Sequence, residues 1–150
     1  MIPFKEALSF VHEAEHWKLK NRDRYAISFY EKALAIYEAH PQFDQEKGEI
    51  IFEIAHLWRA LGKYAIVGGL YLKALSFFEK ASNGHPSLSQ AGVLFHLGEF
   101  LTHLWKLKPA ISYYEKALSM LKALSADSGT ILLVEQQLEK ALKKTVPTQK

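Results

Sequence analysis

The stretch Ile51–Ala74, IFEIAHLWRALGKYAIVGGLYLKA, decides the fold of this chain. Its large and small apolar residues recur three or four positions apart on each side of Gly62. Apolar residues at that spacing line one face of an α-helix, and a glycine between two such segments indicates a tight turn. We therefore predict two amphipathic helices joined at Gly62, neither of which can bury its apolar face alone.

The same unit recurs along the chain. Three Lys-Ala-Leu tripeptides, Lys32–Leu34, Lys73–Leu75 and Lys116–Leu118, lie 41 and 43 residues apart. At equal distances before each alanine, residues of the same class return, which predicts three like units that bury apolar surface by stacking on one another. The recurring residues are Tyr30, Tyr71 and Tyr114 (three before), Ala26, Val67 and Ala110 (seven), Trp17, Trp58 and Leu101 (sixteen), Ala14, Ala55 and Gly98 (nineteen), and Phe10, Ile51 and Leu94 (twenty-three).

Helix start and stop signals predict seven helices. Asp23 is the candidate N-cap of the second helix, and Pro86, next to Ser87, opens the fifth. Lys106–Lys108 forms the turn before the sixth helix, and Pro109 suits the first turn of that helix. The predicted helices run over about 4–20, 23–39, 43–61, 63–82, 86–105, 109–124 and 130–144.

The end of the chain is predicted to close the stack. After a linker at Ser125–Gly129, the seventh helix has one apolar and one polar face, as a terminal cap requires. We predict a single domain over 1–144, with repeats at about 4–40, 43–83 and 86–125, and a disordered tail at 145–150. The apolar face is Ile131, Val134, Leu138 and Ala141, and the polar face is Glu135, Gln136, Glu139 and Lys143.

Composition excludes several classes of function. The chain has 150 residues and no cysteine, so it can form no disulfide and no thiolate site, which fits a reducing compartment. The N-terminus lacks the pattern of a signal peptide, and no apolar run approaches the ~18 residues of a membrane span. The net charge of +3 is mild, and the lysines near the end suit the C-terminus of a helix better than nucleic acid. We expect a cytoplasmic protein that is not an enzyme, has no cofactor and binds neither nucleic acid nor membrane.

The stretch around Gly62, with Trp58, Tyr64, Tyr71 and Ala74, resembles the tetratricopeptide repeat (TPR). The units exceed the usual ~34 residues. Their extra length lies in loops that contain His-Pro, at 38–41 and 83–86, a feature that is similar to the long-repeat arrays of kinesin light chains and related scaffolds. The resemblance implies an all-α, right-handed α-solenoid of three helix-turn-helix repeats plus a C-terminal capping helix.

The resemblance also implies a function, the binding of a peptide or a partner helix in a concave groove lined by the first helix of each repeat. Such a protein serves as a scaffold or adaptor. Carried over position by position, the groove residues are Val11, His12, Glu15, Lys18 and Leu19 in repeat one, Phe52, Glu53, His56 and Arg59 in repeat two, and Phe95, His96, Glu99, Thr102 and His103 in repeat three.

Two known recognition devices of the family are absent from these positions. The carboxylate clamp of chaperone-binding members needs Lys, Asn and Arg where this chain has Val11, Glu15, Glu53, Gly92 and His96. The asparagines of kinesin light chain-like repeats are replaced by His12, Glu53 and His96. Phe52 and Phe95 remain as apolar anchors, and the three glutamates favour a basic or mixed-charge partner. We therefore predict an amphipathic segment with an apolar anchor and at least one Lys or Arg.

Other interpretations of the function stay open. The chain could be a structural or self-associating subunit of a larger assembly, or, more remotely, a metal-binding protein. His12–His16 spells H-E-x-x-H, and His96, Glu99 and His103 could share a helix face with His56 opposite. A histidine-rich groove could also weaken its binding near pH 6. Gly68-Gly69 interrupts the fourth helix, as a close packing contact, a bend or a hinge.

Overall fold

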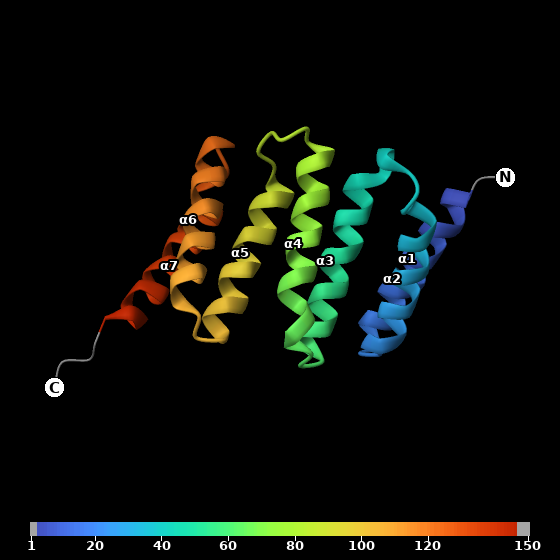
Figure 1. Cartoon of the computed structure of the whole chain (residues 1–150), viewed down its shortest axis with the longest axis horizontal. Coiled ribbons are helices and arrows are strands. Elements are labelled where there is room, and N and C mark those ends of the chain that lie inside the picture. The colour runs from blue at the N-terminus through green and yellow to red at the C-terminus, as the bar shows by residue number, and fades with distance from the viewer. Residues whose placement is uncertain (1–2, 147–150) are drawn as a thin grey trace. The chain divides into compact units, whose positions relative to one another are not determined.

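The computed structural model describes residues 3–146, which form seven α-helices, one short 3₁₀ helix and no strand (Figure 1). This confirms the predicted all-α class and the predicted helices. Within the described residues, none of the helices has the length and apolar character to cross a membrane. The elements are α1 (Pro3–Leu19), α2 (Asp23–Tyr37), η1 (Pro41–Phe43), α3 (Asp44–Ala60), α4 (Tyr64–Ala81), α5 (Leu88–His103), α6 (Leu107–Ala123) and α7 (Ser128–Thr145).

Contacts divide the chain into two compact units, with the boundary between Asn83 and Gly84. In unit 1, α1 pairs with α2 and α3 pairs with α4, and α2 packs on α3. In unit 2, α5 pairs with α6, and α7 packs mainly on α6. The helices of each pair run antiparallel and are joined by a short turn (Figure 1). A single domain over 1–144 remains a prediction.

The core of each pair forms where the aligned small and aromatic residues meet. Ala55 and Tyr71 are fully buried in the second pair, and Gly98 and Tyr114 are buried in the third. Gly98 has no side chain, and the ring of Tyr114 fills the space that one would take. Two ring atoms lie 2.6 Å from the position that a Cβ at Gly98 would have. Small residues at these positions therefore let a tyrosine of the second helix press against the backbone of the first.

All three helix pairs turn in the same way. The second residue after the first helix of each pair has a positive φ: 58° at Asn21, 77° at Gly62 and 59° at Trp105. The next N–H donates to the carbonyl oxygen five residues earlier, as from Lys106 to Leu101 at 2.9 Å, which is the hydrogen bond of a Schellman motif. The predicted turn at Lys106–Lys108 is therefore wrong by two residues, because the left-handed residue is a tryptophan, which gives no turn signal.

Two predicted helix starts also differ from the structure. α2 begins at Asp23 itself, and Arg22 is the N-cap residue with no side-chain hydrogen bond, so Asp23 is not the cap. Asp23 instead lies in the first turn, where its charge suits the helix dipole. α5 begins after Ser87 rather than at Pro86, because the extended backbone of Ser87 lets its hydroxyl oxygen accept from the Gln90 N–H at 3.2 Å.

α7 has the predicted apolar face: Val134 and Ala141 are buried, and the polar face is exposed. The helix begins two residues earlier than predicted, because Asp127 caps it by accepting from the Thr130 N–H at 2.8 Å. Of the predicted disordered tail, Thr145 lies in the last turn of α7, and 147–150 lie outside the described residues. The sequence did not predict three exposed leucines on the same helix, Leu132, Leu133 and Leu142.

α4 runs without interruption through Gly68 and Gly69. A Cβ at Gly69 would meet no atom within 4 Å, and the residue is exposed. Close packing therefore does not explain this glycine.

Candidate functional site

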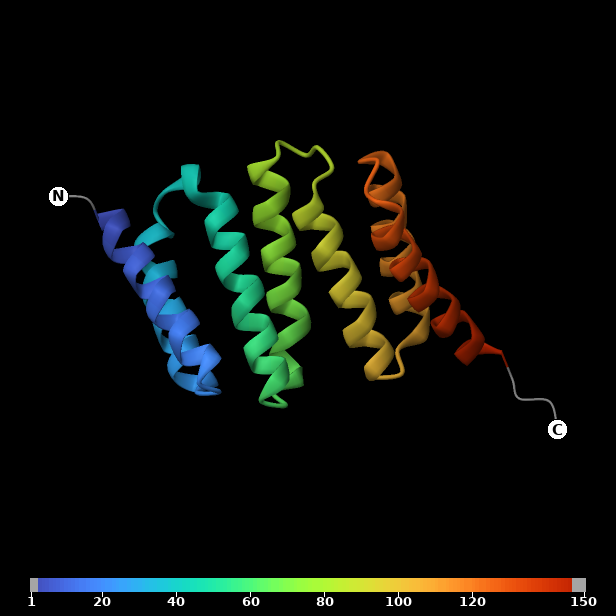
Figure 2. The same ribbon diagram turned by 180° about the vertical axis from the view of Figure 1, so that it is seen from behind.

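The structure brings together two of the predicted groove residues, Lys18 of repeat one and Glu53 of repeat two, on the first helices of unit 1. Lys18 of α1 donates from its Nζ to the Oε2 of Glu53 on α3, at 2.9 Å. Both side chains are more than a third exposed, so the pair contributes at most about 1 kcal/mol to stability. Its importance is geometric, because it shows that α1 and α3 present these positions on one face. Seen from behind, α1 lies in front of α2 (Figure 2).

A buried tyrosine lies beneath this face. Tyr30 of α2 is 2% exposed, and its pKa is raised, first by burial and then by the negative charges of Glu53 and Glu15. Two carboxylates from different helices therefore act on one hydroxyl. We call Glu15, Lys18, Phe52, Glu53 and His56 the acidic face of unit 1.

The raised pKa of Tyr30 predicts how stability depends on alkaline pH. Because the pKa is higher in the folded chain than in the unfolded chain (about 10), the stabilisation is complete below about pH 10 and is lost as the pH rises through the folded-state value. Tyr30→Phe should therefore lose less stability than the wild type between about pH 10 and pH 11.5.

Urea unfolding at several pH values, followed by circular dichroism, measures this difference. Burial also raises the pKa of Tyr37, so part of the loss of stability at alkaline pH should remain in both proteins. If the stability of the wild type and of Tyr30→Phe falls equally with rising pH, the raised pKa of Tyr30 is contradicted.

On α3, an aromatic group extends the acidic face toward α4. The ring of Phe52 meets the ring of His56 edge-on at 4.3 Å and lies 5.7 Å from that of Tyr71. His56 Nδ1 and the Tyr71 hydroxyl share a hydrogen bond of 2.9 Å. His56 is therefore held in place by the core tyrosine of its own repeat, while Phe52 stays partly exposed.

Unit 2 repeats part of this arrangement on α5. Phe95 lies 5.8 Å from Tyr114 with an interplanar angle of 54°, close to the 52° between Phe52 and Tyr71. His96 Nδ1 lies 2.8 Å from Glu99 Oε1, one turn along the helix.

Thr102 and His103, the last two predicted groove residues of α5, do not belong to this aromatic arrangement. The Thr102 hydroxyl donates to the Gly98 carbonyl oxygen of its own helix at 2.8 Å, so it is less available to a partner. His103 is exposed in the last turn, where a positive charge suits the helix dipole.

The predicted histidine ligand sets do not form a metal centre in the described part of the chain. Residues 3–146 contain no group of three His, Asp or Glu side chains placed to hold a metal ion. His12 and His16 are exposed on α1, and the ring of His16 lies edge-on to Trp17 at 5.4 Å. His56 Nδ1 is already bonded to Tyr71. The H-E-x-x-H spacing on α1 therefore has no third protein ligand within residues 3–146.

The sequence assigned the recurring tyrosines to the core and missed their polar contribution. Tyr30 and Tyr71 are buried, as predicted, but the hydroxyl of Tyr71 bonds His56, and that of Tyr30 lies in the field of the acidic face. A signal was present, because tyrosine rather than phenylalanine recurs at this position in every repeat. A buried tyrosine hydroxyl generally has a hydrogen-bond partner.

No protein-family model matches the sequence, and no curated protein gives a significant match. Solved structures do match. BtubC (BKLC) from P. vanneervenii is 22% identical with a TM-score of 0.81, over 91% of this chain and 55% of that chain. A putative kinesin light chain from Podosopora anserina with nearly identical TPR-like repeats is 14% identical with a TM-score of 0.74, over 94% of this chain and 67% of that chain.

The N-terminal domain of stress-induced protein-1 (STI-1) from C. elegans is also similar, with 16% identity, a TM-score of 0.64 and coverage of 89% of this chain and 95% of that domain. This chain therefore spans about half of BtubC and nearly all of the STI-1 domain. The neighbours confirm the predicted resemblance to tetratricopeptide and kinesin light chain-like arrays at the level of the fold. The chain has the TPR-like repeat fold, built from helix pairs packed in sequence order.

Proposed function

We propose that this chain is a non-enzymatic protein-interaction module and that the acidic face of unit 1 binds a segment of a partner protein. Folds of this kind present extended surfaces to protein partners, which supports the general class of function. The absence of cysteine still favours the cytoplasm as its location.

The observation that carries the proposal is the ion pair between Lys18 and Glu53. It joins two repeats at positions that the family uses for binding, and it remains partly exposed. A lysine or arginine of a partner can take the place of Lys18 on Glu53, with Glu15 of the same face nearby. An exchange of this kind costs little, because a half-exposed pair is worth at most about 1 kcal/mol.

Phe52 supplies the apolar part of the proposed contact. Its ring is partly buried against His56 and Tyr71, which fixes its orientation and limits the entropy lost on binding. A partly exposed aromatic side chain on the same helix as Glu53 fits a segment with one apolar anchor and at least one basic residue. Phe95 of unit 2 has the same packing and is proposed to act in the same way.

The binding test starts with partners captured from the native cell and identified by mass spectrometry. Phe52→Ala should weaken binding of a true partner about tenfold or more, and the Phe52→Ala, Phe95→Ala double variant should weaken it further. Glu53→Gln should weaken binding and reduce its dependence on salt, because a charge pair with the partner is lost. Calorimetry with the purified proteins measures each affinity.

Glu79→Gln is the matched control, because it removes an exposed carboxylate of α4 outside the acidic face. This variant should bind as the wild type does. If the phenylalanine variants keep their helical circular dichroism and also bind with unchanged affinity, the acidic face is not the binding surface.

The exposed leucines of α7 support a second candidate, a structural subunit that associates with another chain. Leu132, Leu133 and Leu142 are 53%, 46% and 45% exposed on the terminal helix. We propose that these side chains contribute to an apolar surface that another chain covers, because large exposed apolar patches mark interaction sites. A sizing column with light scattering separates the two candidates, since a monomer favours capture of a segment and a stable dimer favours assembly.

A further inference from the structure

A second surface of unit 1 has the opposite charge to the acidic face. At the ends of α2, α3 and α4 lies an open hollow of about 630 Å³. This volume falls within the roughly 300–1,000 Å³ of ligand pockets. The hollow is lined by Arg24 of α2, Trp58 of α3, and Gly62, Lys63, Tyr64, Ala65 and Ile66 of the turn and the start of α4.

A cation–π contact between two repeats builds the wall of the hollow. The guanidinium carbon of Arg24 lies 5.6 Å from the ring centroid of Trp58. Trp58 is partly buried against the core of unit 1, so the ring is fixed in place. Arg24 itself is exposed, and its planar guanidinium suits a carboxylate that binds through both oxygens. The hollow is therefore an apolar site with a positioned cation at its edge.

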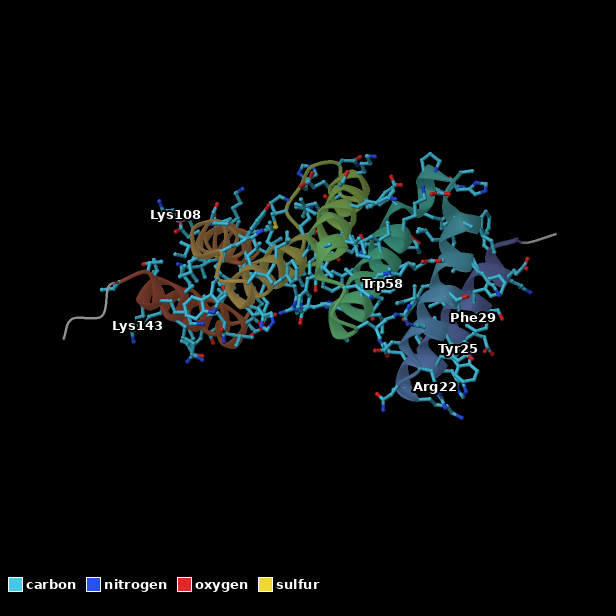
Figure 3. All side chains as sticks on the ribbon, turned by 60° about the horizontal axis from the view of Figure 1, so that its bottom comes forward. Arg22, Tyr25, Phe29, Trp58, Lys108 and Lys143 are labelled. Carbon is cyan, nitrogen blue, oxygen red and sulfur yellow. The ribbon has the colours of Figure 1, made fainter. Side chains whose placement is uncertain are left out.

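The positive charge of the hollow is not neutralised by the described part of the chain. Neither Arg24 nor Lys63 forms an ion pair within residues 3–146. The neighbouring turn adds Lys20 and Arg22 and a single acid, Asp23. Figure 3 brings this end forward, with Arg22 labelled on the N-terminal helices and Trp58 beside them. The hollow thus favours a negatively charged ligand.

We propose that this hollow binds an acidic segment of a partner protein. The segment inserts an apolar side chain between Trp58 and Ile66 and places flanking carboxylates on Arg24 and Lys63. Trp58 and Tyr64 suit an aliphatic or aromatic side chain, because a large ring offers apolar area at little cost in entropy. The site is distinct from the acidic face, so it does not depend on the function proposed for that face.

Two other anionic partners fit the geometry less well. A single-stranded nucleic acid stacks its bases on exposed aromatic faces, whereas the ring of Trp58 is partly buried and covered by Arg24. An anionic membrane is bound by apolar side chains that protrude, whereas this hollow is concave. A protein segment provides both a protruding side chain and fixed carboxylates.

The test uses the full chain and a fluorescent peptide of about twelve residues, made of glutamate and serine with one central leucine. Fluorescence anisotropy should show saturable binding that weakens as salt rises. The Arg24→Gln, Lys63→Gln double variant should bind about tenfold more weakly, and a peptide with serine in place of leucine should lose a similar factor. Ile66→Ser should weaken binding of the leucine peptide in particular.

Lys73→Gln is the control for the loss of a surface charge, because it removes an exposed lysine of α4 away from the hollow, and it should bind as the wild type does. Phe52→Ala should also bind normally, which separates this site from the acidic face. Equal affinity of the wild type and the double variant would overturn the proposal, as would the absence of saturable binding up to about 1 mM peptide. Tighter binding of a single-stranded RNA or of phosphatidylserine vesicles, lost in the same double variant, would assign the hollow to that ligand instead.

Discussion

Tyr71→Ala is expected to lower the free energy of unfolding by about 3–5 kcal/mol, a large share of the roughly 5–15 kcal/mol that stabilises a domain. Tyr71 is fully buried in α4, and its ring packs against Phe52 at 5.7 Å and His56 at 5.4 Å. Truncation removes this packing and leaves a cavity that the two helices cannot close without moving. Urea unfolding followed by circular dichroism measures the loss.

Two variants separate the contributions to this effect. Tyr71→Phe keeps the ring but removes the 2.9 Å hydrogen bond to His56, and it should cost about 1 kcal/mol. Tyr25→Ala truncates a tyrosine that is 58% exposed and should cost less than about 1 kcal/mol. If Tyr71→Ala costs no more than Tyr25→Ala, the recurring tyrosine does not hold the helix pair together.

The recurrence of this tyrosine is also why the fold could be predicted from the sequence. A small residue and a tyrosine sixteen positions later, such as Ala55 and Tyr71, meet in the core of each helix pair. The distance between them along the chain fixes the length of the turn. Because burial repeats with the same period as the sequence, aligning three Lys-Ala-Leu tripeptides identifies the three helix pairs. The start and stop signals then place the ends of the helices to within a few residues.

The error at the third turn shows the limit of rules for single residues. Trp105 takes the left-handed conformation with a φ of 59°, although the rules expect glycine or asparagine there. The alignment contained the missing signal, because Trp105 lies 43 residues after Gly62, which lies 41 residues after Asn21. All three positions are left-handed, so the repeat register predicts the turn better than the residue type does.

The contacts of the candidate sites could not be predicted in the same way. The family resemblance placed Lys18 and Glu53 on the same kind of helix face, but their contact depends on the spacing and rotation of α1 against α3. Neither is encoded in the period of the apolar residues. Arg24 and Lys63 are ordinary basic residues near predicted helix starts in the sequence, and they become a candidate site because α2 and α4 start beside Trp58.

Gly98→Ala is expected to destabilise the chain by about 1–2 kcal/mol, although alanine favours a helix over glycine by about 1 kcal/mol. The new methyl group would lie 2.6 Å from ring atoms of Tyr114, which is itself 1% exposed and has no room to retreat. The aligned Ala14 and Ala55 tolerate a methyl group, so the effect is specific to the closer packing of the third pair. Thermal and urea unfolding both measure it.

Gly69→Ala is the matched control, since a Cβ there meets no atom within 4 Å, and it should stabilise α4 by about 0.5–1 kcal/mol. The same chemical change should thus have opposite signs at two helical glycines. A Tyr114→Leu background should remove most of the cost of Gly98→Ala, because the two residues are then no longer in collision and their effects become nearly additive. If Gly98→Ala stabilises the chain as Gly69→Ala does, the tyrosine ring can move aside, and small residues at this position are not what sets the distance between the helices of a pair.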